Sequence, residues 1–212
     1  MANTDYTAFL PEVMPELAAD PSQPVALNAI KRAVIDFCAG SWIWKYLADP
    51  ISVQAGNAVY DLEPPTGTDI TTVMNVTCNG APLANRTTDW LDEEMPDWRT
   101  KRATPRYFTQ VDTETIILAP VPDYNVAQGL VMTLVLQPSQ SATSFPKWIF
   151  NQYIYAICYG AVGKLMLMNQ KPWTDLKTGD DKRKDFLEEI ANARASSANA
   201  LARAPVRSVN QH

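Results

Sequence analysis

The stretch FPKWIFNQYIYAICYGAVGKLMLM, residues 145–168, decides the fold. Phe145-Pro146 closes a preceding extended region, and the bulky apolar residues after it predict a long, buried helix. The most apolar part, 153–163, is shorter than the ~20 residues that cross a bilayer, so we expect no membrane span. The helix also carries Ala156, Gly160 and Gly163. Because glycine costs up to ~1 kcal/mol in a helix relative to alanine, it indicates that another helix approaches closely here.

We expect the approaching helix to lie near the N-terminus. Ser22 is a candidate N-cap with Pro24 in the first turn, and apolar residues then follow one face as far as residue 47. This face comprises Ala26, Ile30, Ala33, Phe37, Trp44 and Leu47. Ile30 and Phe37 are therefore candidates for packing against Ala156, Gly160 and Gly163. A shorter helix, made irregular by two prolines, is predicted at 6–19.

A third long helix is predicted near the C-terminus. Thr178 followed by Asp181 matches a capping box, and Phe186, Leu187, Ile190 and Leu201 follow. Beyond Ile190 the sequence is rich in alanine, which favours helix but contributes little burial. We therefore expect this part to need a neighbouring subunit, and residues 204–212 to form an exposed tail.

The middle of the chain has the signals of strands. Short apolar segments at 51–53 and 58–60 flank Ala55-Gly56-Asn57, which predicts a hairpin, and residues 70–78 lead into the stronger turn signal Asn79-Gly80. Pro82 makes the next strand short or places it at an edge. Further strands are predicted at 106–111, 115–119 and 130–136, which together form a compact sheet or sandwich.

The expected fold is therefore α+β. N- and C-terminal helices form a helical bundle from 1–48 and 145–203, and a central antiparallel β domain occupies 49–144. Residues 204–212 are the flexible tail.

The composition argues against nucleic-acid binding and secretion. The formal net charge is −5, whereas proteins that grip phosphates carry dense Lys and Arg. Cys38, Cys78 and Cys158 are an odd set without CxxC spacing, which suggests a reducing compartment. The N-terminus lacks a basic start followed by an apolar run, so we expect no signal peptide and synthesis in a cytoplasm.

Few residues offer catalytic chemistry. The one histidine is His212, and neither GxxxxGK[ST] nor GxGxxG occurs, so we expect no enzyme, cofactor or metal site. One alternative is a metal-dependent enzyme that uses the carboxylates of 92–94 and 180–181. Another is a glycan-binding module that stacks sugars on Trp90 and Trp98, although these tryptophans are more simply interpreted as anchors of a lid.

The order of elements resembles the head-to-tail adaptor proteins of short-tailed bacteriophages, the tail-tubular-protein-A-like group. The resemblance covers most of the chain and rests on several segments. These are the aromatic run 41–46 (SWIWKY), TPRYF at 104–108, TIILAPVPD at 115–123, the strand 130–136, and the helix from Pro146 with its small residues.

This resemblance implies a structural protein of the virion. It implies a homo-oligomeric ring, a dodecamer, between the portal protein and the tail nozzle, through which DNA passes without sequence-specific binding. It also implies that the C-terminal segment docks on the portal, with Arg203, Pro205, Val206, Arg207 and Val209 as candidates. The turn Asn79-Gly80 is our candidate contact with the tail. The alternative within this class is another head-completion or tail-associated module.

Overall fold

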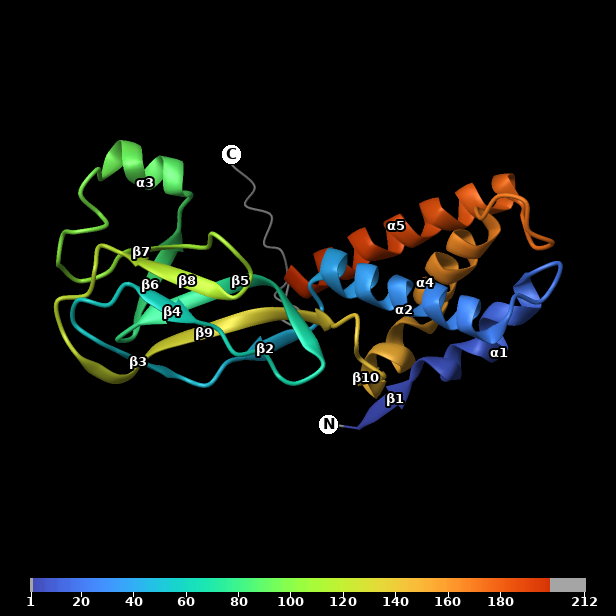
Figure 1. Cartoon of the computed structure of the whole chain (residues 1–212), viewed down its shortest axis with the longest axis horizontal. Coiled ribbons are helices and arrows are strands. Elements are labelled where there is room, and N and C mark those ends of the chain that lie inside the picture. The colour runs from blue at the N-terminus through green and yellow to red at the C-terminus, as the bar shows by residue number, and fades with distance from the viewer. Residues whose placement is uncertain (1, 199–212) are drawn as a thin grey trace, which may run out of the picture. The chain divides into compact units, whose positions relative to one another are not determined.

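The computed structural model describes residues 2–198, which separate into two compact units (Figure 1). The helical unit comprises residues 2–43 and 143–198, and the β unit comprises residues 44–142. Helices and a largely antiparallel sheet are both present, so the prediction of an α+β fold is confirmed.

The helical unit begins with short elements and continues with three long helices. Strand β1 (Asn3–Asp5) pairs antiparallel with β10 (Ser144–Pro146). The irregular N-terminal segment consists of η1 (Tyr6–Phe9), α1 (Leu10–Val13) and η2 (Met14–Glu16). The long helices α2 (Gln23–Ser41), α4 (Lys147–Met166) and α5 (Leu176–Ala198) contact one another (Figure 1).

Helix α2 ends earlier than predicted. Trp42 adopts a left-handed conformation with φ of 56°, and its backbone N–H donates to the carbonyl of Cys38. The chain then enters strand β2 (Lys45–Leu47) of the β unit. The expected helix to residue 47 is therefore wrong, because Trp44 packs against the core of the sheet instead.

Helix α5 begins earlier than predicted. The carboxylate of Asp175 accepts hydrogen bonds from the backbone N–H of Thr178 at 3.1 Å and from its hydroxyl at 2.7 Å. The predicted capping box at Thr178 and Asp181 is therefore wrong, and Asp181 instead lies 3.5 Å from the amine of Lys184. The prediction of a long helix in this part of the chain is confirmed.

The glycines of α4 lie against α5. A Cβ added at Gly160 would lie 2.7 Å from the ring of Phe186, and one at Gly163 would lie 3.2 Å from the carbonyl oxygen of Gly179. The expectation that the N-terminal helix approaches these glycines is therefore wrong. Helix α2 contacts α4 elsewhere, where the rings of Phe37 and Tyr153 have centroids 4.9 Å apart.

The β unit is built on one sheet that curls around its core. Its strands follow the order β2-β9-β5-β6-β7-β8-β4, and β3 also pairs with β9. Their bounds are β3 Ile51–Val53, β4 Val59–Asp61, β5 Thr68–Cys78, β6 Ala81–Asn85, β7 Tyr107–Thr109, β8 Thr115–Ala119 and β9 Val126–Pro138. Strands β6 and β7 are parallel, and the other neighbours are antiparallel.

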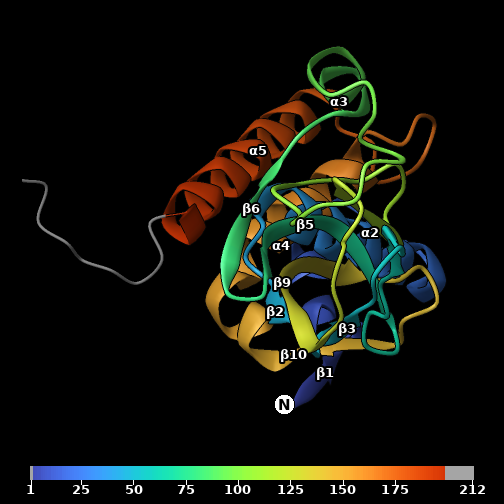
Figure 2. The ribbon, with the colours of Figure 1, turned by 90° about the vertical axis from the view of Figure 1, so that its left-hand side faces the viewer.

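The curl brings strands from both ends of this order into one core (Figure 2). Tyr60 of β4 and Ile116 of β8 belong to the same buried cluster as Leu130 and Leu134 of β9. Helix α3 (Thr88–Glu94) lies outside this cluster and has its own small core around Leu91 and Trp98.

The first predicted hairpin is wrong. Strand β3 pairs with β9 and strand β4 pairs with β8, so the two do not pair with each other. The connection is held by tertiary contacts, because the N–H of Gly56 donates to the carbonyl of Pro122 at 2.8 Å. The phenol of Tyr60 donates to the carbonyl of Asn57 at 2.9 Å.

The second predicted hairpin is confirmed. Strands β5 and β6 pair antiparallel around Asn79 and Gly80, whose φ angles are 50° and 76°. Both positive angles suit the Asn-Gly turn. Strand β6 is short, as Pro82 suggests, but it is not an edge strand. Pro82 lies opposite Thr77 of β5, and only the later residues of β6 pair with β7.

Candidate assembly surfaces

The predicted portal-docking residues lie outside the described part of the chain. These are Arg203, Pro205, Val206, Arg207 and Val209. Their role remains a prediction from the sequence.

The predicted tail-contact turn lies at the surface of the β unit. Asn79 and Gly80 are both exposed, and nothing lies within 4 Å of a Cβ built at Gly80. The backbone N–H of Asn79 donates to the carbonyl of Gly129 at 2.7 Å, which ties the turn to β9. The turn is therefore an ordered projection with room around its tip.

The predicted helix-packing residues lie in the interior of the helical unit. Ile30 and Phe37 of α2 are fully buried, and Ala156, Gly160 and Gly163 of α4 are buried as well. Phe37 faces both Tyr153 and Phe186, whose rings belong to α4 and α5. All five residues are therefore covered by the helical unit itself and offer no surface to a partner.

Three of the carboxylates considered for metal chemistry, Asp92, Asp180 and Asp181, have cationic partners. Asp92 accepts hydrogen bonds from the guanidinium of Arg99 and from the indole of Trp98, and these bonds hold the pKa of its carboxyl below the usual value. Lys184 and Arg183 lower the pKa of Asp180 in the same way. Within residues 2–198, no three His, Cys, Asp or Glu side chains are grouped as metal ligands.

The tryptophans considered for sugar stacking are already covered. Trp98 is only 2% exposed and has the guanidinium of Arg99 over its ring, at 4.3 Å from the centroid. The ring of Trp90 meets Tyr107 edge-on, with the guanidinium of Arg86 4.9 Å from its centroid. These contacts match the interpretation of the tryptophans as structural anchors.

The cysteines are buried free thiols. Burial raises the pKa of both Cys38 and Cys158 to about 12, so both thiols stay protonated at neutral pH. A buried, protonated thiol is a poor nucleophile and metal ligand.

Two surface hollows were not predicted from the sequence. In the helical unit, a pocket of about 360 Å³ is lined by Asn28, Ala29, Arg32, Lys164, Leu167, Met168 and Arg183. Three of these side chains are basic and three are apolar. We refer to this site as the basic pocket. Its residues come from three helices and from the turn that follows α4, so no local sequence signal marks it.

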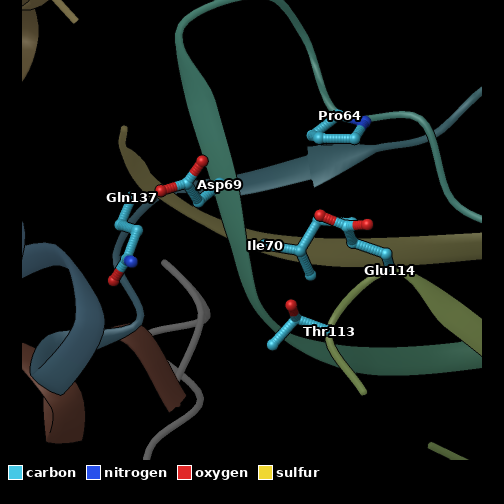
Figure 3. A pocket seen from close by; sticks show the side chains of 6 residues that line it. All are labelled: Pro64, Asp69, Ile70, Thr113, Glu114 and Gln137. Carbon is cyan, nitrogen blue, oxygen red and sulfur yellow. The ribbon is translucent and has the colours of Figure 1, made fainter. Parts of the chain in front are cut away.

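The second hollow, in the β unit, is polar. It also measures about 360 Å³ and is lined by Pro64, Asp69, Ile70, Thr113, Glu114 and Gln137. Figure 3 shows Asp69 beside Gln137 at one side, and Glu114 with Thr113 at the other. Two residues before Thr113 in the chain, Val111 is 67% exposed, although the sequence predicted it at the end of a strand. Strand β7 in fact stops at Thr109.

The two units differ in charge. The β unit contains twelve Asp and Glu against six Lys and Arg, a net charge of −6. The rest of the chain contains eleven acidic and twelve basic residues, a net charge of +1. The overall charge of −5 is therefore concentrated in the β unit.

Comparison with protein families identifies the chain. A family model described as SU10 adaptor protein matches residues 4–209. The chain belongs to the SU10 adaptor protein family. This is a family of phage head-to-tail adaptors, so the resemblance drawn from the sequence is confirmed. Among curated proteins, no relative matches.

The surfaces described above are thus those of a phage structural adaptor. Family membership covers both units, since the match spans the helical residues at either end and the whole β unit. In the described part of the chain, no helix is both long enough and apolar enough to cross a membrane.

Proposed function

We propose that this chain is a virion protein that joins the portal of the phage head to the tail nozzle as a ring. The observation that carries the proposal is the family match over residues 4–209. The resemblance of the sequence to tail-tubular-protein-A-like adaptors supplies the finer assignment, a dodecamer through which DNA passes.

The distribution of charge supports a role in the DNA conduit. Proteins that hold DNA neutralise its phosphates with Lys and Arg, whereas an acidic wall lets the duplex slide. The β unit has a net charge of −6. We propose that this unit contributes to the wall of the conduit.

The helices supply the rigid part of this adaptor. We propose that α2, α4 and α5 act as a helical bundle formed by residues 1–48 and 145–203, and that residues 49–144 form the β domain that carries the tail-contact turn. The close contacts of Gly160 and Gly163 with α5 support a rigid bundle, because buried close packing leaves little freedom for the helices to shift.

The C-terminal segment and the exposed turn of the β unit are assigned to different partners. We propose that residues 204–212 dock on the portal, with Arg203, Pro205 and Arg207 near the contact and Val206 and Val209 inserted. We propose that the turn at Asn79 and Gly80 contacts the tail nozzle. The exposure of this turn and its bond to β9 support the second assignment.

The experiment is reconstitution with purified portal rings, observed by electron microscopy. The full-length chain should add a ring of density at the tail-facing end of the portal. A chain that lacks residues 204–212 should fold with an unchanged melting temperature but bind the portal more weakly. If the full-length chain fails to associate with the portal at every salt concentration, the proposed function is wrong. Association with another virion component would instead identify a different head-completion or tail module.

A further inference from the structure

We propose that residues 110–114 of one copy, which we call the valine loop, dock into the basic pocket of a neighbouring copy. The inference rests on the proposed function, because it identifies the surfaces by which copies of this chain would join into a ring. It follows from two surface features of the same chain that are complementary in polarity and charge.

The basic pocket combines apolar surface with unsatisfied positive charge. Ala29, Leu167 and Met168 supply the apolar lining. Two of the three cations have carboxylate partners, since the amine of Lys164 lies 2.7 Å from Asp36 and the guanidinium of Arg183 lies 2.9 Å from Asp180.

Arg32 is the cation that remains. The sequence suggests an i,i+4 pair between Arg32 and Asp36, but Asp36 pairs with Lys164 of α4 instead. Arg32 is exposed, and it makes no ion pair with any residue that the structure describes. A ligand that places an apolar side chain in the pocket and a carboxylate at Arg32 would satisfy both features.

The valine loop presents these two groups together. Val111 is 67% exposed, one of the most exposed large apolar side chains in the described part of the chain. Glu114 follows three residues later, is exposed, and has no ion-pair partner among residues 2–198. Asp69, on the other side of the polar hollow, adds a second carboxylate nearby (Figure 3).

Hydrogen bonds within the β unit hold the loop in shape. One carboxylate oxygen of Asp112 accepts from the backbone N–H groups of Glu114 at 2.8 Å and Thr115 at 2.7 Å. The amide oxygen of Gln110 accepts from the backbone N–H of Val73 at 3.1 Å, which attaches the start of the loop to β5. A loop that is already ordered loses less conformational entropy when it binds.

A second copy of this chain is the occupant to which the observations point. The apolar, basic pocket and the apolar, acidic loop occur in one chain, and the loop belongs to the β unit, whose net charge is −6. Contacts between two different surfaces of identical subunits are heterologous, and repetition of such a contact produces a closed ring or a filament. The inferred contact therefore has the asymmetry that a ring requires.

Disulfide trapping tests this contact between copies. A Val111→Cys variant is mixed with a Met168→Cys variant, over a series of protein concentrations and also in the presence of portal rings. We expect covalent dimers under mild oxidation, because Cys38, Cys78 and Cys158 are buried and leave the new thiols to react. A chain that carries both substitutions should yield a ladder of covalent oligomers.

Two matched pairs serve as controls. Val59→Cys replaces another exposed valine of the β unit, 49% exposed, and Leu187→Cys replaces an exposed leucine of α5, 54% exposed. The Val59→Cys and Met168→Cys pair, and the Val111→Cys and Leu187→Cys pair, should each give at least tenfold less dimer than the test pair.

Charge exchange provides a second measurement. Arg32→Glu and Glu114→Arg should each lower the yield of trapped dimer at least tenfold, and the chain with both changes should regain most of it. Asp49→Arg, which reverses another exposed carboxylate of the β unit, should leave the yield within about twofold.

The possible failures are distinguishable. If the chain forms rings on the portal but the test pair forms no more dimer than the controls, the inference is wrong and the proposed function stands. If the doubly substituted chain closes only within itself, the occupant is not a second copy and the inference is also wrong. If specific dimers form but the chain never binds the portal, the contact between copies holds and the proposed function fails.

Discussion

The substitution Gly160→Ala tests how α4 and α5 cross. The added Cβ would lie 2.7, 2.8 and 2.9 Å from three carbons of the Phe186 ring, whereas ordinary contacts of a Cβ begin at about 3.4 Å. Phe186 is only 5% exposed, and its ring packs beside that of Phe37, with centroids 6.2 Å apart. The ring therefore has little space into which it can move.

The expected change in stability is a balance of two terms. Overpacking of a core by one carbon costs roughly 1–3 kcal/mol. Replacement of glycine by alanine in a helix regains about 1 kcal/mol of intrinsic propensity. We expect Gly160→Ala to lower the free energy of unfolding by up to about 2 kcal/mol, even though alanine is the better helix former.

A double-mutant cycle with Phe186→Leu isolates the contact. Leucine lacks the ring carbons that meet the new methyl group, so the doubly substituted chain should lose less stability than the sum of the two single losses. We expect a coupling free energy of about 0.5–3 kcal/mol, the range for residues in contact. The measurement is urea unfolding followed by circular dichroism. Phe108→Leu, in the core of the β unit, is the control partner and should be additive with Gly160→Ala to within about 0.5 kcal/mol.

Two results would refute this reasoning. If Gly160→Ala stabilises the chain by about 1 kcal/mol, the helix crossing is not tight at this position. If the cycle with Phe186→Leu is additive to within about 0.5 kcal/mol, α5 does not supply the contact.

Three further predictions concern titration and local geometry. Burial raises the pKa of Cys38 and Cys158 from an ordinary value of 9.0 to about 12. Because the thiols of the unfolded chain ionise first, the free energy of unfolding should keep the full contribution of these thiols below pH 9 and lose it between pH 9 and 12. Thermal melts in reducing buffer should show a melting temperature that falls over this range, and Cys158→Ala should make the fall less steep. Asp92→Ala should lower the melting temperature more than Asp92→Asn, because an asparagine oxygen can still accept the 2.7 Å hydrogen bond from the Trp98 indole; equal losses would contradict this account. Gly80→Ala should cost about 1–2 kcal/mol in urea unfolding, because φ is 76° there, and an unchanged midpoint would contradict that backbone geometry.

Local signals were sufficient for much of the β unit. The run Thr115–Ala119 was predicted with the bounds that strand β8 has, because a short run rich in β-branched residues, bounded by polar residues and a proline, defines a strand without reference to its neighbours. The Asn79-Gly80 turn could likewise be predicted from its two residues alone, since both tolerate positive φ. The parallel pairing of β6 with β7 carries no such local signal, because it joins segments separated by α3.

The junction between α2 and β2 shows where local signals fail. Trp44 and Leu47 continue the apolar spacing of α2, so helical periodicity alone extends the helix through them. In the structure, Trp42 turns left-handed, Trp44 packs on the core of the sheet, and Leu47 is 66% exposed. The few apolar residues after the turn fit the periodicity of a helix as well as that of a strand. Packing of Trp44 on the sheet is what makes this segment a strand.

The basic pocket was even harder to predict from the sequence. From sequence, Arg32 and Asp36 form the expected helical pair, but such a pair contributes only about 0.2–0.5 kcal/mol, so a tertiary partner displaces it easily. Lys164 is that partner, at 2.7 Å from Asp36, and the exchange leaves Arg32 beside an apolar pocket. The feature that supports the inferred contact between copies is thus produced by the loss of a weak local interaction. The pair expected from the sequence is therefore wrong, because a sequence pattern contains no information on which helix brings a competing cation.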